Sequence, residues 1–245
     1  MCPVAKQEKI DVSRRSALVG AGLGVATLTG LGVAGLAASN AASAKASSPV
    51  PTDPTQALER LMDGNARYIA GKAMGPNRGS DRRKETESEG QSPYAAIISC
   101  ADSRVAPEIL FDEGVGDLFV MRVAGNVVDP LILGSLEFGV AVLGCKTIMV
   151  LGHEECGAVK AAMDVAAGGD KLPGNIQALA DKIGPYVKGI DKKKVPQAVR
   201  VNARETVKEI LVKSSIINDA VKSGKANIVA GYYDLDEGRV TMVAA

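Results

Sequence analysis

The chain has 245 residues, which is enough for one substantial domain with some length left for a tail. Apolar residues make up 46% of the sequence and support a real core, although aromatic residues are only 3% and tryptophan is absent. The formal net charge of +1 excludes the marked basic excess that nucleic-acid-binding proteins usually carry, so we expect no nucleic-acid partner.

Residues 1–46 have the pattern of a targeting segment and not of a folded domain. Arg14 and Arg15 directly precede an apolar, glycine-rich run over 18–38, and small residues at 42–46 fit an A-x-A cleavage site. This pattern resembles a bacterial twin-arginine (Tat) signal. We therefore expect the Tat export machinery as a partner and a periplasmic or extracellular protein. The alternative is an uncleaved membrane anchor, because the run is nearly long enough to span a bilayer.

Three cysteines remain once the predicted signal, with Cys2, is removed: Cys100, Cys145 and Cys156. An odd number in an exported protein argues against a disulfide framework. Two thiols on a metal and one buried packing thiol, Cys145, would explain the count, with a free reactive thiol at Cys145 as the alternative. Folding before export would give thiolate ligands their metal before they meet an oxidising compartment.

A helical arm is predicted over about 53–71. Asp53 supplies a helix N-cap, and Pro54 follows at the first helical position. Apolar residues then recur at helical spacing, with an interruption at Gly64 and Asn65. The arm is expected to begin the folded domain.

The folded domain is expected over 47–245. A polar stretch at 74–91 predicts a surface loop, and strand-type and helix-type segments alternate from Pro93 onward. This alternation predicts an α/β fold with a central, mainly parallel sheet of about four parallel strands plus an antiparallel edge strand, flanked by helices. The predicted strands are 94–99, 117–123, 146–151, 228–233 and 240–243. The predicted helices are 107–111, 130–143, 156–166, 176–187 and 198–221.

Metal-binding side chains follow the first and the third of these strands, where each strand ends. The first is followed by Cys100 and Asp102, and the third by Cys156 and by His153, the sole histidine. Because the functional crevice of an open α/β sheet lies at the carboxyl ends of its strands, the four side chains can converge. Two thiolates, an imidazole and a carboxylate or water make a tetrahedral zinc shell. The alternative is two ordinary buried thiols and a structural histidine.

Several short motifs carry a resemblance to a known family. They are CADSRV from Cys100, RVAGN from Arg122, SLEFGV from Ser135 and HEECGA from His153. Together they resemble the β-class carbonic anhydrase family, and GQSP from Gly90 matches its plant-type active-site branch. The similarity covers about residues 58–243. The family carries Zn²⁺ on two cysteines and one histidine, which implies Cys100, His153 and Cys156 as the ligands here.

The resemblance implies a catalytic role for Asp102 and Arg104. Paired with the guanidinium, the Asp102 carboxylate turns away from zinc and accepts a hydrogen bond from zinc-bound water or hydroxide; it is the fourth ligand only in a closed state. Zinc-bound hydroxide then attacks carbon dioxide in a reversible hydration that yields bicarbonate and a proton. The alternative for this pair is a simple loop salt bridge.

The resemblance also implies a substrate pocket. In it, Gln91 hydrogen-bonds a substrate oxygen, Phe119, Ala124 and Phe138 line an apolar wall, and Gly157 offers a backbone N–H. The two phenylalanines also suit core packing. No histidine is left as a proton shuttle, so the proton must leave through water, buffer or another side chain.

Family members pair with their active sites near the subunit interface, which implies a homodimer or a higher dimer-based oligomer here. Two alternative functions stay open: hydrolysis of carbonyl sulfide or carbon disulfide on the same scaffold, and a non-catalytic zinc module. The presence of Asp102, Arg104 and Gln91 weighs against the second, since a structural zinc needs no open position.

Overall fold

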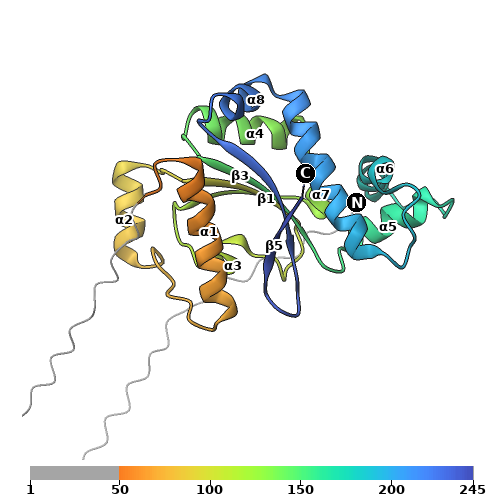
Figure 1. Ribbon diagram of the computed structural model, residues 1–245, viewed down its shortest axis with the longest axis horizontal. Helices are drawn as coiled ribbons and strands as arrows, with labels where there is room; N and C mark the ends of the chain where they lie inside the picture. Colours follow the sequence, from red (N-terminus) through yellow and green to blue (C-terminus); the bar gives the residue numbers. More distant parts are fainter. Residues whose placement is uncertain (1–49, 245) are drawn as a thin grey trace, which may run out of the picture. The chain divides into compact units, whose positions relative to one another are not determined.

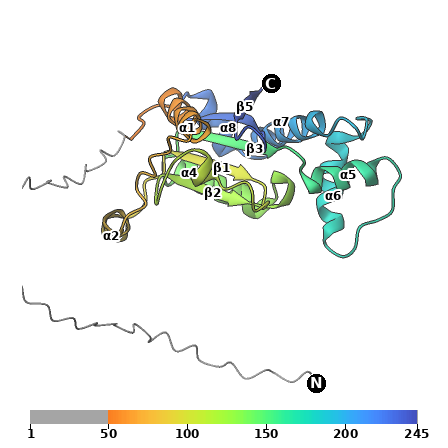
Figure 2. The same cartoon turned by 90° about the horizontal axis from the view of Figure 1, so that it is seen from below.

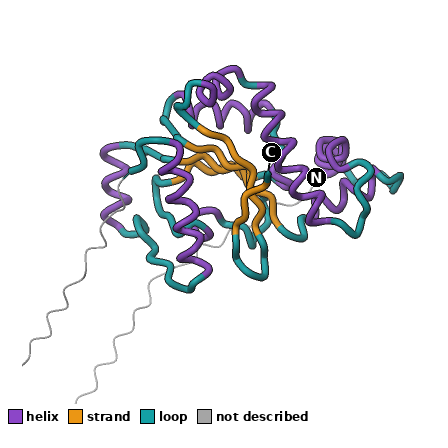
Figure 3. The backbone as a smooth tube through the Cα atoms, in the orientation of Figure 1, coloured by secondary structure: helices purple, strands orange, loops and turns teal. Residues whose placement is uncertain are grey.

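The computed structural model describes residues 50–244, whose centre is a five-stranded sheet of order β2-β1-β3-β4-β5 (Figure 3). The first four strands are parallel, and the fifth is an antiparallel edge strand. The predicted fold class and the final hairpin are therefore confirmed. The strands are β1 (Ala95–Ser99), β2 (Leu118–Arg122), β3 (Thr147–His153), β4 (Asn227–Tyr233) and β5 (Val240–Val243).

Helices cover both faces of the sheet, and further helices lie beside one end of it. They are α1 (Pro54–Ile69), α2 (Ser80–Glu89), α3 (Pro107–Leu110), α4 (Pro130–Ala141), α5 (Gly157–Ala166), α6 (Ile176–Val187), α7 (Val195–Lys213) and α8 (Ser215–Lys222). A 3₁₀ turn, η1 (Ala124–Asn126), follows β2. In two perpendicular views α5 and α6 stand together beside the sheet, while α2 lies apart on the opposite side (Figures 1 and 2).

The two central strands are buried along their whole length, because each face of the sheet has its own hydrophobic core. Successive side chains of a strand point to opposite faces. Ile97 accordingly packs in the core that α1 and α3 cover, while Ile98 packs in the core of α4, α7 and α8. Near-continuous apolar strands of this kind are typical of a parallel sheet covered on both sides.

The predicted arm forms α1, and its N-cap is confirmed because Asp53 accepts two backbone N–H groups. The helix continues through Gly64 and Asn65, where the apolar pattern is interrupted. Gly64 allows a close approach, since a Cβ there would lie 1.8 Å from the carbonyl oxygen of Phe111. Asn65 is buried and bonds the backbone of Gly238 and Val240. Both residues serve tertiary contacts, which helical periodicity does not reveal.

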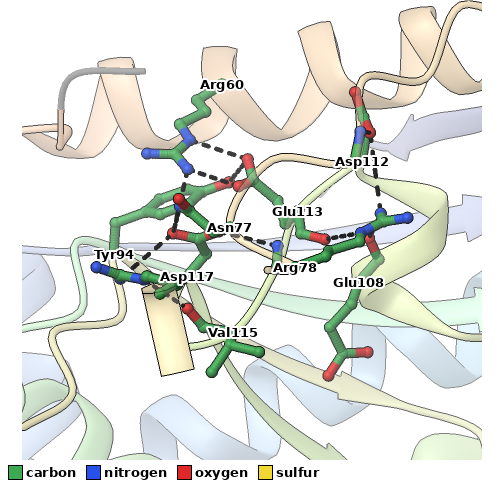
Figure 4. A network of polar contacts seen from close by, with 12 residues as sticks. Arg60, Asn77, Arg78, Tyr94, Glu108, Asp112, Glu113, Val115 and Asp117 are labelled. Atoms are coloured by element: carbon green, nitrogen blue, oxygen red, sulfur yellow. Dashed lines mark hydrogen bonds and ion pairs between the residues drawn. The ribbon is translucent and has the colours of Figure 1, made fainter. Parts of the chain in front are cut away.

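Helix α1 packs on the sheet of its own chain, where Ala57 and Leu61 are fully buried. A charge network also attaches it near the amino end of β1 (Figure 4). Arg60 makes two hydrogen bonds with Glu113, at 2.9 and 2.6 Å, and its guanidinium stacks over the ring of Tyr94. The Tyr94 hydroxyl donates to the same carboxylate at 2.7 Å.

Helix α2 and the break between α7 and α8 were not predicted. The stretch predicted as a loop contains α2, whose side chains are polar and leave no apolar periodicity to detect; an i,i+3 pair of Arg82 and Glu85 lies along it. The single helix predicted over 198–221 is two helices. It breaks at Ser214, whose Oγ accepts the Ile217 N–H and donates to Glu137.

The predicted export signal lies outside the described residues, so the structure does not test it. Among the helices of residues 50–244, none combines the length and the apolar character needed to cross a membrane.

Candidate metal centre

The two ligand-bearing segments leave neighbouring parallel strands at the same edge of the sheet. Ser99 of β1 lies opposite Leu151 of β3, so Cys100, directly after β1, and His153, the last residue of β3, lie at the same carboxyl edge of the sheet. Cys156 comes three residues later and is the N-cap of α5. The ligand atoms of Cys100, His153 and Cys156 all lie within 4.8 Å of one another, and all three residues are buried.

The His153 ring is oriented for metal binding. Its Nδ1 lies 2.7 Å from the carbonyl oxygen of Glu154, which can only accept, so Nδ1 carries the proton. The lone pair is then on Nε2, which is buried and has no hydrogen-bond partner within residues 50–244. A buried polar atom without a partner is unfavourable, and a metal at this point would satisfy it.

These residues fit zinc. The donor set of two sulfurs and one imidazole nitrogen leaves a fourth position free, as in catalytic zinc sites. In a tetrahedral zinc site such donor atoms are about 3.5–3.8 Å apart, which agrees with the compact cluster.

Hydrogen bonds favour thiolate at this cluster. The Cys156 thiol donates to Cys100 and lowers the pKa of Cys100 to about 4, with the Gly125 N–H acting in the same direction against burial. The proton that the two sulfurs share then stays on Cys156, whose pKa is raised. The amides that open α5, at Ala158 and Val159, act against this rise.

Asp102 and Arg104 form the predicted pair. Nε of Arg104 donates to Oδ1 of Asp102 at 2.9 Å, and Nη2 donates to Oδ2 at 2.7 Å. The guanidinium holds the pKa of Asp102 well below its usual range. Oδ2 lies 3.9 Å from Nε2 of His153, so the carboxylate faces the ligand cluster while it is bound by the guanidinium.

A second arginine braces the loop that carries this pair. Arg122 donates to the backbone carbonyls of Cys100, at 3.0 Å, and Asp102, at 2.5 Å. The sequence alone did not indicate this role, because it depends on β2 lying beside β1 with Arg122 opposite Ser99.

The predicted pocket residues divide into two groups. Ala124 and Gly157 adjoin the metal ligands, through η1 and the first position of α5. Gln91 precedes β1 and is exposed, and β1 alone spans roughly 16 Å. Phe119 lies opposite Ala96, four positions before Cys100, and its ring centroid is 6.2 Å from that of Phe138. Within one chain, Gln91, Phe119 and Phe138 are therefore not beside the ligands.

Cys145 lies apart from the ligand cluster. Its Sγ donates to the carbonyl oxygen of Pro93 at 3.4 Å, and burial raises the pKa of the thiol to about 12. The interpretation as a packing thiol is confirmed.

Comparisons with known proteins agree on one family. Residues 95–240 match the family model described as "Carbonic anhydrase". The chain is 39% identical over 196 residues to carbonic anhydrase 2 of Mycobacterium tuberculosis, covering 78% of this chain and 93% of that protein. The Coccomyxa β-carbonic anhydrase, solved with acetazolamide, matches with a TM-score of 0.58 at 25% identity, over 76% of this chain and 86% of that one.

A tetrameric β-carbonic anhydrase of the ascomycete Sordaria macrospora matches with a TM-score of 0.60, over 78% of this chain and 98% of that one. The identity in this case is 20%, so the match bears on the fold alone.

Proposed function

The chain belongs to the β-class carbonic anhydrase family and is an enzyme of that family, and we propose that it hydrates carbon dioxide reversibly at a zinc ion held by Cys100, His153 and Cys156. The observation that carries this proposal is the buried cluster of two sulfurs and one unpartnered imidazole nitrogen, with a fixed carboxylate beside it. When bound, zinc supplies a Lewis acid that lowers the pKa of a coordinated water to about 7.

The protein's own contribution starts with Asp102. Because Arg104 binds both carboxylate oxygens, Asp102 is kept ionised and is held away from the fourth ligand position. Its Oδ2 can accept a hydrogen bond from the attacking water and so direct an oxygen lone pair toward carbon dioxide. One C–O bond forms, and one C=O π bond becomes a C–O⁻. One of the water's two protons leaves to solvent or buffer and the other stays on the attacking oxygen, which gives bicarbonate.

Arg122 and the 3₁₀ turn hold this geometry. The two hydrogen bonds from Arg122 hold the backbone carbonyls of Cys100 and Asp102, at the start of the loop that carries the carboxylate. Ala124 adds an apolar surface next to the ligands, which suits a small nonpolar gas.

We propose that the pocket is completed in a homodimer or a higher dimer-based oligomer. Gln91 and Phe138 are exposed and lie away from the ligands of their own chain. A two-fold arrangement would let these residues face the metal centre of a second copy.

The proposal of Tat export to the periplasm or the cell exterior rests on residues 1–46 and stays a prediction of the sequence.

The test combines stopped-flow carbon dioxide hydration with metal analysis of the purified protein. We expect about one zinc per chain and rapid hydration, with both lost in Cys100→Ser, because a hydroxyl is a poor substitute for a thiolate ligand. Cys145→Ser is the matched control, and it should retain zinc and activity because that thiol is remote from the cluster.

Full hydration activity in zinc-free protein would refute the proposal. Sulfide release from carbonyl sulfide or carbon disulfide without carbon dioxide turnover would assign the site to that substrate class.

A further inference from the structure

Two hydrogen bonds in series connect helix α7 to the metal centre. The backbone N–H of Gly125 donates to Sγ of Cys100 at 3.4 Å, and the Gly125 carbonyl accepts from Nδ2 of Asn202 at 2.9 Å. All three residues are buried, Asn202 completely. We propose that Asn202 is a positioning residue of the metal centre, which holds the Gly125 amide against the Cys100 thiolate. This inference rests on the proposed function to the extent that Cys100 binds a metal.

The 3₁₀ turn needs such an anchor. Gly125 has φ +74° and ψ 14°, in the left-handed region where glycine is the least restricted residue. The next residue, Asn126, also has a positive φ of 46°, and its side-chain amide has no hydrogen-bond partner in the part of the chain that the structure describes. The side chain of the turn's own asparagine therefore does not hold the turn, whereas Asn202 fixes the carbonyl directly after the Gly125 Cα.

Close packing lets α7 reach this turn. A Cβ at Gly152 would lie 2.7 Å from Cγ1 of Val199, so glycine at this position allows α7 to lie directly over the end of β3. Gly152 immediately precedes His153, so this contact sets the height of α7 above a ligand strand. Asn202 is on the same helix, three residues after Val199, and its reach to Gly125 follows from this placement.

The bond to Gly125 also explains why a polar side chain is buried here. Asn202 lies among the apolar contacts of α7, and its Oδ1 has no partner among residues 50–244. Burying an amide group in such surroundings is unfavourable unless the hydrogen bonds it makes compensate. Among the described residues, the one side-chain hydrogen bond of Asn202 goes to the turn whose N–H contacts a metal ligand.

An N–H donor on a ligating sulfur orients the thiolate and withdraws charge from it. Loss of the Asn202 donor would release the Gly125 carbonyl and loosen the backbone of the turn. The hydrogen bond from the Gly125 N–H to Cys100 would then weaken. The expected results are weaker metal binding and an altered metal–sulfur bond.

Asn202→Leu tests the proposal, because leucine is close in size and lacks the donor. We expect zinc affinity, measured by competition with a chelator, to fall about 10-fold. The sulfur-to-metal charge-transfer absorption of the cobalt(II)-loaded protein should shift in the same variant. Both measurements are independent of turnover, so they stand even if carbon dioxide hydration is absent.

Two controls separate positioning from general destabilisation. Asn65→Leu removes an equally buried amide that bonds Gly238 and Val240 on the α1 side, so it should lower the melting temperature without changing the zinc affinity or the cobalt spectrum. Thr206→Val, one turn further along α7, removes a buried hydroxyl that has no partner within residues 50–244, and it should leave both readouts unchanged.

If Asn202→Leu does not fold, Asn202→Ala, which also lacks the donor, should show the same losses. Wild-type zinc affinity and cobalt spectrum in a folded Asn202 variant would overturn the proposal, as would equal changes in Asn65→Leu.

The wild-type protein offers a further test after loading with a spin-active cadmium isotope. A scalar coupling between cadmium and the Gly125 amide proton is expected, and its absence would contradict the arrangement.

Discussion

At the scale of single residues, the metal centre depends on keeping one carboxylate close to the ligands without letting it become a ligand. Asp102 is partly exposed and lies 3.9 Å from Nε2 of His153. Its position is therefore set by hydrogen bonds from Arg104, two from the guanidinium and one from the backbone N–H, and not by burial. Charge-assisted bidentate bonds of this type are among the stronger side-chain contacts. The pair therefore controls whether the fourth metal position is open.

Arg104→Gln should release this carboxylate. We expect activity to fall about 100-fold, since a displacement of about 1 Å in an active site has an effect of that order. Zinc content should be retained because Arg104 contacts none of the three ligands. A crystal structure of the zinc-loaded variant should show an Asp102 carboxylate oxygen at the fourth metal position in place of water.

Arg83→Gln is the control for loss of an arginine, since Arg83 lies on the exposed helix α2 and its side chain makes no ion pair or hydrogen bond within residues 50–244. It should keep wild-type activity. A fully active Arg104→Gln protein would show that the pair is a loop salt bridge without a catalytic role.

At the scale of the elements, α1 is attached to the sheet by both apolar contacts and buried charges (Figure 4). Glu113 is only 1% exposed, and burial raises its pKa. The hydrogen bonds from Arg60 and Tyr94 act in the opposite direction and lower it. A buried carboxylate that loses its partner is strongly destabilising, typically by about 3–5 kcal/mol.

Arg60→Leu should therefore lower the free energy of unfolding by about 3–5 kcal/mol near neutral pH. Without Arg60, the Glu113 pKa rises further, so the folded state binds more protons than the unfolded state. Stability then falls as pH rises through that pKa, and the deficit of the variant should shrink below a pH of about 4.5. Urea unfolding of variant and wild type across this pH range measures the difference.

Arg239→Leu is the matched control, because it removes an exposed pair with Glu237. Its effect should stay within about 1 kcal/mol at every pH. A deficit in Arg60→Leu that grew toward acid pH would contradict the assignment of Glu113 as the group responsible.

At the scale of the whole molecule, one chain carries its metal ligands and its predicted substrate contacts at different places. Gln91 precedes β1 and Cys100 follows it, while Phe138 is 46% exposed on α4. Two copies related by a two-fold axis would combine the ligands of one chain with the exposed residues of the other. Complementation between variant chains tests this arrangement.

We expect Cys100→Ser and Gln91→Leu chains each to be impaired alone and to recover activity when refolded together. In a hybrid dimer, one of the two sites has intact ligands and an intact Gln91, so an equal mixture should reach about a quarter of wild-type activity. Cys100→Ser with His153→Ala is the control pair, since both changes damage the ligands of their own chain and no site is restored. A mixture no more active than the mean of its parents would place Gln91 outside the site of a second copy.

The sequence by itself determined the chemistry of the site and the class of fold. Cys100, Asp102, His153 and Cys156 lie at or just after the ends of two apolar strands. Side-chain type and strand period are local properties that can be read directly from the order of residues. The parallel sheet and the final hairpin followed from the same local signals. The helix break at Ser214 was missed because its cap also bonds Glu137, 77 residues away.

Only the tertiary structure decided which residues support the ligands and which lie far from them. Asn202 and Gly125 are 77 residues apart, and they meet because α7 packs closely over Gly152. Gln91 is only nine positions from Cys100, yet an extended strand separates the two. Distance along the chain does not fix distance in space, since helix packing brings remote residues together and a strand holds near neighbours apart.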